Sequence, residues 1–315
     1  MKGIIRLIFL LLTMSPAAYA NDTSIGEVNG SIAMLKQNDV SMEKERLLIS
    51  PQRINVDYLF INHGQQDVTL PVAFPMPPKQ FDSGQDHNPG IMNFKLSVDG
   101  NPVKPQVRWV AQLLDDNGHP QEDITNKLLK IGWTVEKLRD VITSDDFFKQ
   151  PDNLPALPKS WMKYGGANLA VQQYFIWQQT FPAGKEVMIN HSYTPSMTSG
   201  VPREFADITD KKCLTDDNRK RLAQLRSRYK TDDTEDFFPG FNWSEISYIL
   251  TTGANWKGGV IGDFTLRVHT NEPKEVAAVC FNYSLKQIDP LTQEFKQKNF
   301  KPERDLSVIY LSASR

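Results

Sequence analysis

Apolar and polar residues alternate along much of this sequence, and this alternation constrains the fold more than any other feature. Every second residue is apolar in residues 54–60, 68–74 and 94–98. The same spacing holds, with one polar exception each, in residues 171–177 and 187–193. Side chains two residues apart lie on one face of a strand, so each stretch is predicted to be a strand with one buried face. Turn residues separate the first two stretches and the last two, which predicts two β-hairpins.

Two segments are predicted to be helical instead. In residues 121–165, Asp123 or Thr125 can cap a first helix and Thr134 a second one, before prolines end the helical pattern. A strongly charged helix is expected from Thr215 to about residue 229. These segments interrupt a sequence whose other regular elements are all predicted to be strands.

The predicted fold is therefore mainly β, an antiparallel β-sandwich architecture with a helical insertion and one further charged helix. The composition agrees, because 17 Phe, 9 Tyr and 6 Trp occur beside 20 Pro and 18 Gly, and aromatic residues with frequent turn formers favour strands. We expect an N-terminal β-rich part in residues 21–120, the helical insertion in 121–165 and a C-terminal β-rich part in 166–315. A single domain over residues 21–315 is the alternative.

The first twenty residues have the pattern of a secretory signal peptide. Lys2 and Arg6 flank the start of an apolar run, and Ala18-Tyr19-Ala20 offers small residues for cleavage. A run of about nine apolar residues is too short to cross a bilayer, which needs roughly 20. We therefore expect residues 1–20 to be removed and no transmembrane anchor to remain. The expected location is the periplasm or the outside of the cell.

The charge of the chain argues against one class of partner. With 36 basic and 37 acidic residues, the formal net charge is −1, and a nearly neutral chain has no general attraction to nucleic acid. The expected partner is a protein or glycan of the cell envelope, and no cofactor is predicted.

The chain contains two cysteines, Cys213 and Cys280. An even pair in an exported protein is most simply a disulfide, because oxidising compartments preserve disulfides. A reactive thiol and half of a metal site are the alternatives, and no motif supports either. We therefore predict that Cys213 and Cys280 are joined.

Several runs of the sequence resemble a bacterial exported family catalogued as domain of unknown function 4424. The runs that carry the resemblance are YFIWQQTFPAGK at 174–185, HSYTP at 191–195, TGANW at 252–256 and IGDF at 261–264, with further matches at 49–51, 72–77 and 299–302. Together they cover essentially the whole chain after residue 20. The resemblance implies export, and it supplies no catalytic residue.

The glycine-rich stretch 252–259 is the first candidate ligand site. Its glycines allow close approach of the backbone to a ligand, while Trp256 offers a stacking face and Asn255 an amide. Asp263, which follows this stretch, is a further ligand-binding candidate. The alternative, which we favour, is a hairpin loop whose Trp256 packs back onto the sheets.

His191 is the fourth candidate. It is in phase with Val187, Ile189 and Tyr193, so it is predicted to face inward, where a half-buried histidine can act as a general base or metal ligand. A hydrogen-bonded core histidine is the alternative that we favour. The five histidines show no metal-binding spacing, and no metal site is predicted.

No catalytic motif is recognisable, and no catalytic residue is predicted. The sequence lacks a nucleophile elbow, and Cys213 has no local protease signature. We expect a non-catalytic binding or envelope-assembly module, and we leave enzymatic activity open. The alternative is a hydrolase of envelope polysaccharide or peptide, which would require two carboxyl groups within about 5 to 10 Å of each other in a cleft.

Overall fold

The structure of this chain, a computed structural model, describes residues 22–28, 31–80, 91–116, 118, 120–142, 154–163, 166–200, 213–228 and 241–313. It is mainly β, with several antiparallel sheets and few helices, as the alternation predicts. The predicted signal peptide, residues 1–20, lies outside the described residues. Among the helices that are described, none combines the length and the apolar character required to cross a membrane.

The large sheet has eight strands in the order β19-β20-β17-β3-β4-β14-β7-β8. All its pairs are antiparallel except β17 with β3, which are parallel. The strands are β3 (Val40–Ile49), β4 (Ile54–Asn62), β7 (Met92–Val98), β8 (Asn101–Val103), β14 (Glu186–Thr194), β17 (Ile261–His269), β19 (Lys286–Asp289) and β20 (Thr292–Phe300).

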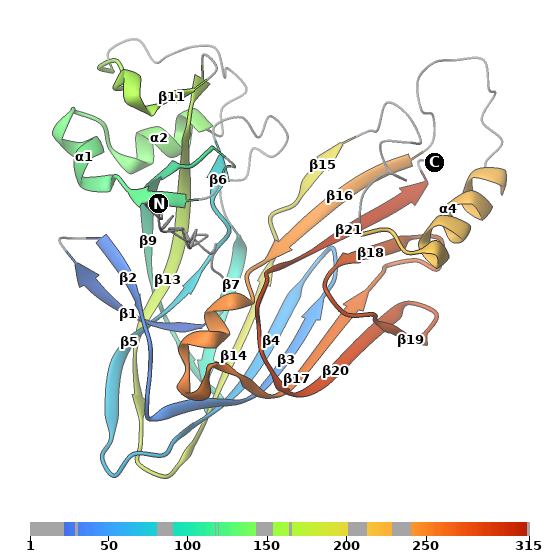
Figure 1. Cartoon of the computed structure of the whole chain (residues 1–315), viewed down its shortest axis with the longest axis horizontal. Helices are drawn as coiled ribbons and strands as arrows, with labels where there is room; N and C mark the ends of the chain where they lie inside the picture. Colours follow the sequence, from blue (N-terminus) through green and yellow to red (C-terminus); the bar gives the residue numbers. More distant parts are fainter. Residues whose placement is uncertain are drawn as a thin grey trace, which may run out of the picture.

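Two further sheets cover the inner face of the large sheet (Figure 1). The second sheet has the order β10-β9-β13-β5-β1-β2, with β6 beside β13, and the third has the order β15-β16-β21-β18. The second sheet comprises β1 (Thr23–Val28), β2 (Ser31–Leu35), β5 (Val68–Pro75), β6 (Lys79–Gln80), β9 (Gln106–Leu114), β10 (Pro120–Asp123) and β13 (Leu169–Phe181). The third comprises β15 (Thr198–Gly200), β16 (Phe241–Tyr248), β18 (Val276–Cys280) and β21 (Leu306–Ala313). A separate two-stranded sheet pairs β11 (Met162–Lys163) with β12 (Gly166–Ala167).

The two predicted hairpins are wrong in their pairing, although their strands are present. β4 belongs to the large sheet and β5 to the second sheet, and the same division separates β14 from β13. Each turn therefore carries the chain from one layer to the other, so that two apolar faces meet across the core. Alternation defines the buried face of a strand but not its hydrogen-bonded neighbour, which explains the error.

The main core lies between the large sheet and the other two. Val56 and Phe60 of β4, Val72 of β5 and Val308 of β21 all belong to one buried cluster. The inner side chains of the large sheet are thus held by two sheets, while its outer face is not covered by any described helix or sheet. As far as the described residues extend, one broad face of the large sheet is therefore accessible to a ligand.

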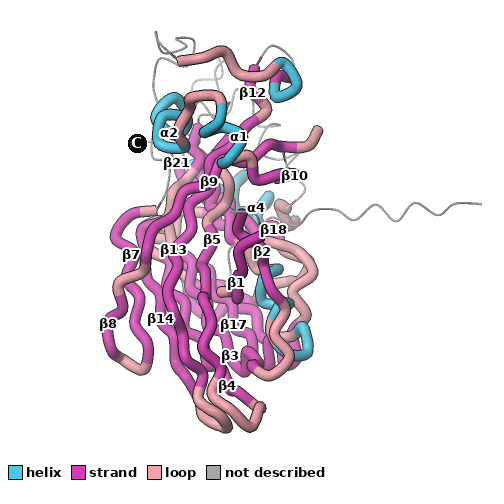
Figure 2. Tube along the Cα trace, turned by 90° about the vertical axis from the view of Figure 1, so that its left-hand side faces the viewer, coloured by secondary structure: helices cyan, strands magenta, loops and turns pink. Residues whose placement is uncertain are grey.

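Three helices pack on the outer sides of the smaller sheets. α1 (Thr125–Lys130) and α2 (Val135–Ile142) lie at one end of the second sheet (Figure 2). The hydroxyl of Thr134 accepts a hydrogen bond from the Lys137 amide at 3.1 Å, as expected for a helix cap. α4 (Asp216–Arg228) is the charged helix, and it packs against β18 of the third sheet. Short 3-10 turns occur at Lys159–Trp161 (η1), Thr251–Asn255 (η2) and Lys257–Gly259 (η3).

The predicted disulfide is present. Cys213, just before α4, is bonded to Cys280 at the end of β18, with their Cα atoms 4.7 Å apart and a sequence separation of 67. The bond fastens α4 to the third sheet beside the buried Leu222 and Leu225.

The sheets combine strands from both ends of the chain. β3 pairs with β17, more than two hundred residues later, and β9 pairs with β13. The expected part boundaries near residues 120 and 165 therefore do not coincide with boundaries between sheets.

Candidate functional site on the outer face of the large sheet

Polar side chains form two rows across the outer face of the large sheet. The register of neighbouring strands places these residues side by side, and the period-two rule turns all of them away from the core. The first row is Lys296, Thr265, Arg46, Asp57, Asn190 and Ser97. The second row is Glu294, Arg267, Leu48, Asn55, Ser192 and Lys95. Each row crosses six strands, so residues distant in sequence form one continuous surface.

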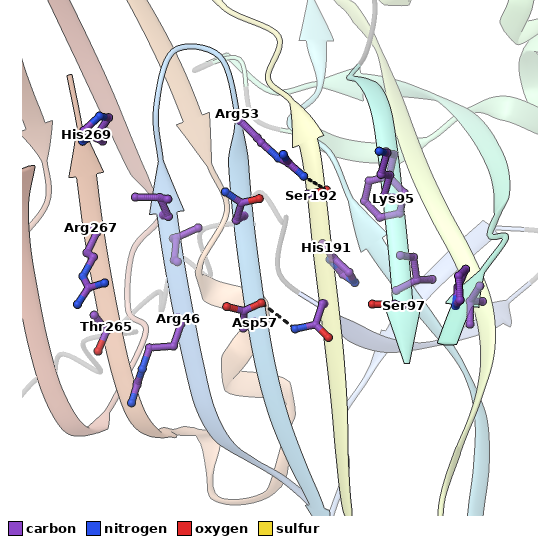
Figure 3. A pocket seen from close by; sticks show the side chains of 18 of the residues that line it. Arg46, Arg53, Asp57, Lys95, Ser97, His191, Ser192, Thr265, Arg267 and His269 are labelled. Atoms are coloured by element: carbon purple, nitrogen blue, oxygen red, sulfur yellow. Dashed lines mark hydrogen bonds between the residues drawn. The ribbon is translucent and has the colours of Figure 1, made fainter. Parts of the chain in front are cut away.

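Except for Lys296 and Glu294 at their β20 end, the two rows form the floor of an open hollow of about 1320 Å³. It extends from Pro102 and Lys104, near the β8 edge, to Ile288 and Asp289 in β19. Figure 3 shows labelled side chains of both rows, contributed by β17, β3, β4, β14 and β7. The hollow is therefore built on strands rather than on loops, and strands hold side chains in fixed positions.

Hydrogen bonds between neighbouring strands orient the floor. The Asn190 amide donates to Asp57 Oδ1 at 2.7 Å. The Arg53 guanidinium, from the turn between β3 and β4, donates to the Ser192 hydroxyl at 2.9 Å (Figure 3). Both contacts are solvent-exposed, so these groups are ordered and still accessible to a ligand.

Carboxylates neutralise the cations at one side of the floor. Arg46 is 2.8 Å from Asp263, and Lys298 is 2.9 Å from the same carboxylate. Hydrogen bonds from Arg46 and Lys298 lower the pKa of Asp263 to about 2. In the same way, Glu294 is 2.8 Å from both Arg267 and Lys296. This half of the floor is a network of matched charges.

The other half has cations without a matching carboxylate. Within the described parts of the chain, Arg53, Lys95 and Lys104 form no ion pair, and all three are exposed. Among the described residues, those that line the hollow include five arginines and lysines and two carboxylates, Asp57 and Asp289. The hollow is therefore locally positive, although the whole chain has a net charge of −1.

The candidate residues in the glycine-rich loop lie elsewhere. Trp256 is 2% exposed and packs on Phe60 and Phe181, with ring centroids 4.6 and 5.7 Å away. Its indole N–H donates to the Asp22 carbonyl at 2.7 Å, and the Asn255 amide donates to the Thr23 hydroxyl at 3.0 Å. The loop thus fastens the start of β1, and the Trp256 ring presents no open face for stacking. Trp256 thus packs back onto the sheets as the favoured alternative predicts, but the loop is not a hairpin loop, because it joins β16 of the third sheet to β17 of the large sheet.

His191 faces the core, on the side of β14 opposite Asn190. Its ring lies edge-on to Tyr58, Phe74 and Trp177, and its Nε2 is 3.5 Å from Asp22 Oδ2. Burial lowers the pKa of His191 to about 3. His191 is among the residues that line the hollow, but its side chain is fully buried, so the ring itself is closed off from a ligand there.

Asp263 is the one predicted ligand residue that lies on the outer face. It contacts Arg46 of the first row but does not line the hollow. The structure therefore brings none of Asn255, Trp256, His191 and Asp263 together in a common site.

A buried polar cluster beneath the sheet was not predicted. Glu45 is fully buried in phase with the core residues of β3. The Tyr248 hydroxyl lies 3.5 Å from Glu45 Oε1 and 3.2 Å from the Tyr58 hydroxyl. Burial, and next the charge of Glu45, raises the pKa of Asp22 well above 3.8. The sequence signal for this cluster was Glu45, a carboxylate at a position where the alternation of the strand calls for an apolar residue.

The described residues that line the hollow do not present the carboxylate pair of a glycosidase. Asp57 lies on β4 and Asp289 on β19, four strand spacings apart, which corresponds to about 19 Å at about 4.8 Å per spacing. Glycoside hydrolysis requires about 5 to 10 Å. In the described ranges, no three His, Cys, Asp or Glu residues gather in a way that could hold a metal ion.

Comparisons with known proteins give a family and two distant likenesses. A family model described as "Domain of unknown function (DUF4424)" matches residues 20–309. A crystal structure of a "putative nutrient binding protein" from Legionella pneumophila is similar with a TM-score of 0.49 and 16% identity, covering 94% of this chain and 70% of that chain. A crystal structure of the M1 zinc metallopeptidase of Deinococcus radiodurans, as the E323A mutant bound to a Tyr-Ser-Ala substrate, is similar with a TM-score of 0.29 and 10% identity, covering 88% of this chain and 43% of that chain. No curated protein matches. Likenesses this weak do not indicate a shared activity.

Proposed function

The chain belongs to the family described as domain of unknown function (DUF4424), and we propose that it is a non-catalytic binding protein of the cell envelope. Its ligand lies in the hollow on the outer face of the large sheet. The observation that carries this proposal is the pair of polar rows, which are ordered by hydrogen bonds and open to solvent on a strand scaffold. Binding sites need such fixed polar groups in a concave surface.

Two features support action outside the cytoplasm. The first twenty residues have the charge, apolar run and small residues of a signal peptide. The Cys213–Cys280 disulfide suits an oxidising compartment, because disulfides are rare where thiols are kept reduced.

A substitution that blocks the hollow tests the proposed binding function. Asn190→Trp places an indole at the centre of the floor, where it overlaps any ligand that crosses the rows. The wild-type protein is immobilised and exposed to an envelope extract, and retained compounds are identified by mass spectrometry. We expect Asn190→Trp to reduce retention of the specific compound by at least about tenfold, equivalent to about 1.4 kcal/mol.

Glu186→Trp provides the matched control. Glu186 is exposed, lies four residues away on the same strand and face, and does not line the hollow. This variant should retain the compound as well as the wild type does. Equal retention by a folded Asn190→Trp variant would show that the ligand does not occupy the hollow.

A further inference from the structure

We propose that the ligand of the hollow is an acidic glycan, a chain of sugar units that carry carboxylate groups, laid across the strands along the two rows. This inference rests on the proposed binding function and specifies the ligand class. Three independent features of the hollow support it: its unmatched cations, the donor and acceptor order of its floor, and its position on a sheet face.

The unmatched cations call for an anionic ligand. Arg53, Lys95 and Lys104 surround one half of the hollow without a carboxylate partner among the described residues. Arg53 uses one of its nitrogens on Ser192, and a guanidinium has five donors in total. Its remaining donors can hold a carboxylate, for which the planar guanidinium is well shaped.

The floor also suits hydroxyl groups. Along the first row, the donor Arg46 is followed by the acceptor Asp57 and then by Asn190 and Ser97, which both donate and accept. A sugar hydroxyl likewise donates and accepts, so neighbouring hydroxyls can bond alternately along the row. The Asn55 and Ser97 side chains have no hydrogen-bond partner within the described residues, and both line the hollow.

Thr265 adds a buried group of the same kind. It is 3% exposed, lines the hollow and lies beside Arg46, and its hydroxyl oxygen lacks a hydrogen-bond partner in the described structure. A buried hydroxyl without a partner is unfavourable. A ligand group that reached the Thr265 hydroxyl would supply the missing hydrogen bond.

The location of the hollow favours a glycan over an acidic peptide. Peptides are commonly bound by adding a strand to a sheet edge, where backbone groups are free. Here the floor is the face of the sheet, and its strands already pair on both sides. Within the hollow, the first row covers four strand spacings from Thr265 to Ser97, about 19 Å at about 4.8 Å each, which is long enough for several sugar units.

Isothermal titration calorimetry at low ionic strength tests the ligand class with three compounds. These are a short oligogalacturonate, a neutral cello-oligosaccharide of the same length, and an oligo-glutamate of the same charge. We expect the oligogalacturonate to bind, and to bind more weakly as salt is added. The other two compounds should bind at least about tenfold more weakly.

Variants locate the binding in the hollow. Arg53→Gln combined with Lys95→Gln should weaken oligogalacturonate binding at least about tenfold, and both residues are exposed, so the fold should be unaffected. The control with the same change in charge is Lys298→Gln combined with Lys301→Gln, because these lysines are 77% and 68% exposed, paired with Asp263 and Glu303, and outside the hollow. It should leave the affinity unchanged, and an equal loss in this control would reduce the effect to general charge and overturn the inference.

The remaining outcomes separate this inference from the proposed function. Equal affinity for oligo-glutamate overturns the glycan assignment in favour of an acidic peptide. No binding of oligogalacturonate, combined with retention of another envelope compound that Asn190→Trp abolishes, overturns the ligand class and leaves the binding function intact. If Asn190→Trp does not reduce the retention of the envelope compound, both the ligand class and the binding function of the hollow are overturned.

Discussion

The two faces of the large sheet carry similar polar side chains in opposite surroundings. β4 turns Asp57 outward and Tyr58 inward, and β14 turns Asn190 outward and His191 inward. The outer groups are exposed and bonded to their neighbours across the strands. The inner groups are sealed between three sheets. The same alternation thus produces a polar floor on one side and a buried polar cluster on the other.

Burial decides the charge state on each face. Inside, burial favours the neutral forms, lowering the pKa of His191 to about 3 and raising the pKa of Asp22. Outside, hydrogen bonds from Arg46 and Lys298 lower the pKa of Asp263 to about 2 and keep it charged. We infer that the inner cluster holds the layers together, while only the outer face keeps charges that a ligand can use.

The largest expected effect is on the inner side, at Trp256. Trp256→Ala removes the ring that packs on Phe60 and Phe181 and the donor to the Asp22 carbonyl. We expect the free energy of unfolding to fall by about 3 to 5 kcal/mol, as for other buried aromatic truncations. Urea unfolding followed by circular dichroism measures this loss.

Trp256→Phe separates packing from the hydrogen bond. It keeps an aromatic ring in the core and loses the indole donor, so a loss nearer about 1 to 3 kcal/mol is expected. Folded Trp256→Ala protein should still bind in the hollow, which lies on the other face of the sheet. Lost binding with unchanged stability would instead make the glycine-rich loop the ligand site.

An intermediate effect on stability is expected from lowering the pH, through the protonation of His191. Its folded pKa of about 3 lies below 6.5, so its contribution to stability is complete above about pH 6.5 and is lost as the pH falls toward 3. Between about pH 6.5 and about pH 4.5 the loss is about 3 kcal/mol, at 1.36 kcal/mol per pH unit. His191→Phe, which suits a site lined by aromatic rings, should remove this part of the acid sensitivity.

The comparison requires urea unfolding of wild type and His191→Phe at both pH values. Asp22 acts in the opposite direction, because its raised folded pKa means that its contribution is present below 3.8 and declines as the pH rises. Asp22 is present in both proteins, but it lies 3.5 Å from His191, so the difference between the two profiles reports on the Asp22–His191 pair. Parallel pH profiles would show that the pKa of His191 is the same in the folded and the unfolded protein.

The sequence predicts the strands and their buried faces well, but not their partners. Val187, Ile189 and Tyr193 are buried as the alternation requires. The neighbours of β14, however, are β4 and β7 rather than β13. Periodicity acts within one strand, whereas pairing depends on how whole layers pack, and a turn between two strands can equally bend within a sheet or cross between sheets.

The same limit explains the missed site. Arg46, Asp57 and Asn190 become neighbours only through the register of β3, β4 and β14. Nothing in the local sequence of any one strand marks that row. Trp256 and His191 stand out by residue type, but their surroundings include Asp22, which lies far away in sequence.

The smallest expected effect on stability is on the outer face, at Asp263. Asp263→Asn breaks the ion pairs with Arg46 and Lys298, and surface pairs contribute about 1 kcal/mol or less. The lowered pKa means that this contribution is present above 3.8 and lost as the pH falls toward 2. Urea unfolding near neutral pH should show the difference, and added salt should shrink it.

The affinity of Asp263→Asn for oligogalacturonate tests the contrast between the two faces a second time. Freed from Asp263, Arg46 adds a further unmatched cation to the first row, so affinity for oligogalacturonate should rise while stability changes little. Trp256→Ala should instead lower the stability and leave the affinity of the folded protein unchanged, so the pair of variants separates the two roles. If Asp263→Asn lowered the stability as much as Trp256→Ala does, the outer ion pairs would also be needed to hold the fold together. The assignment of stability to the inner face and of binding to the outer face would then be wrong.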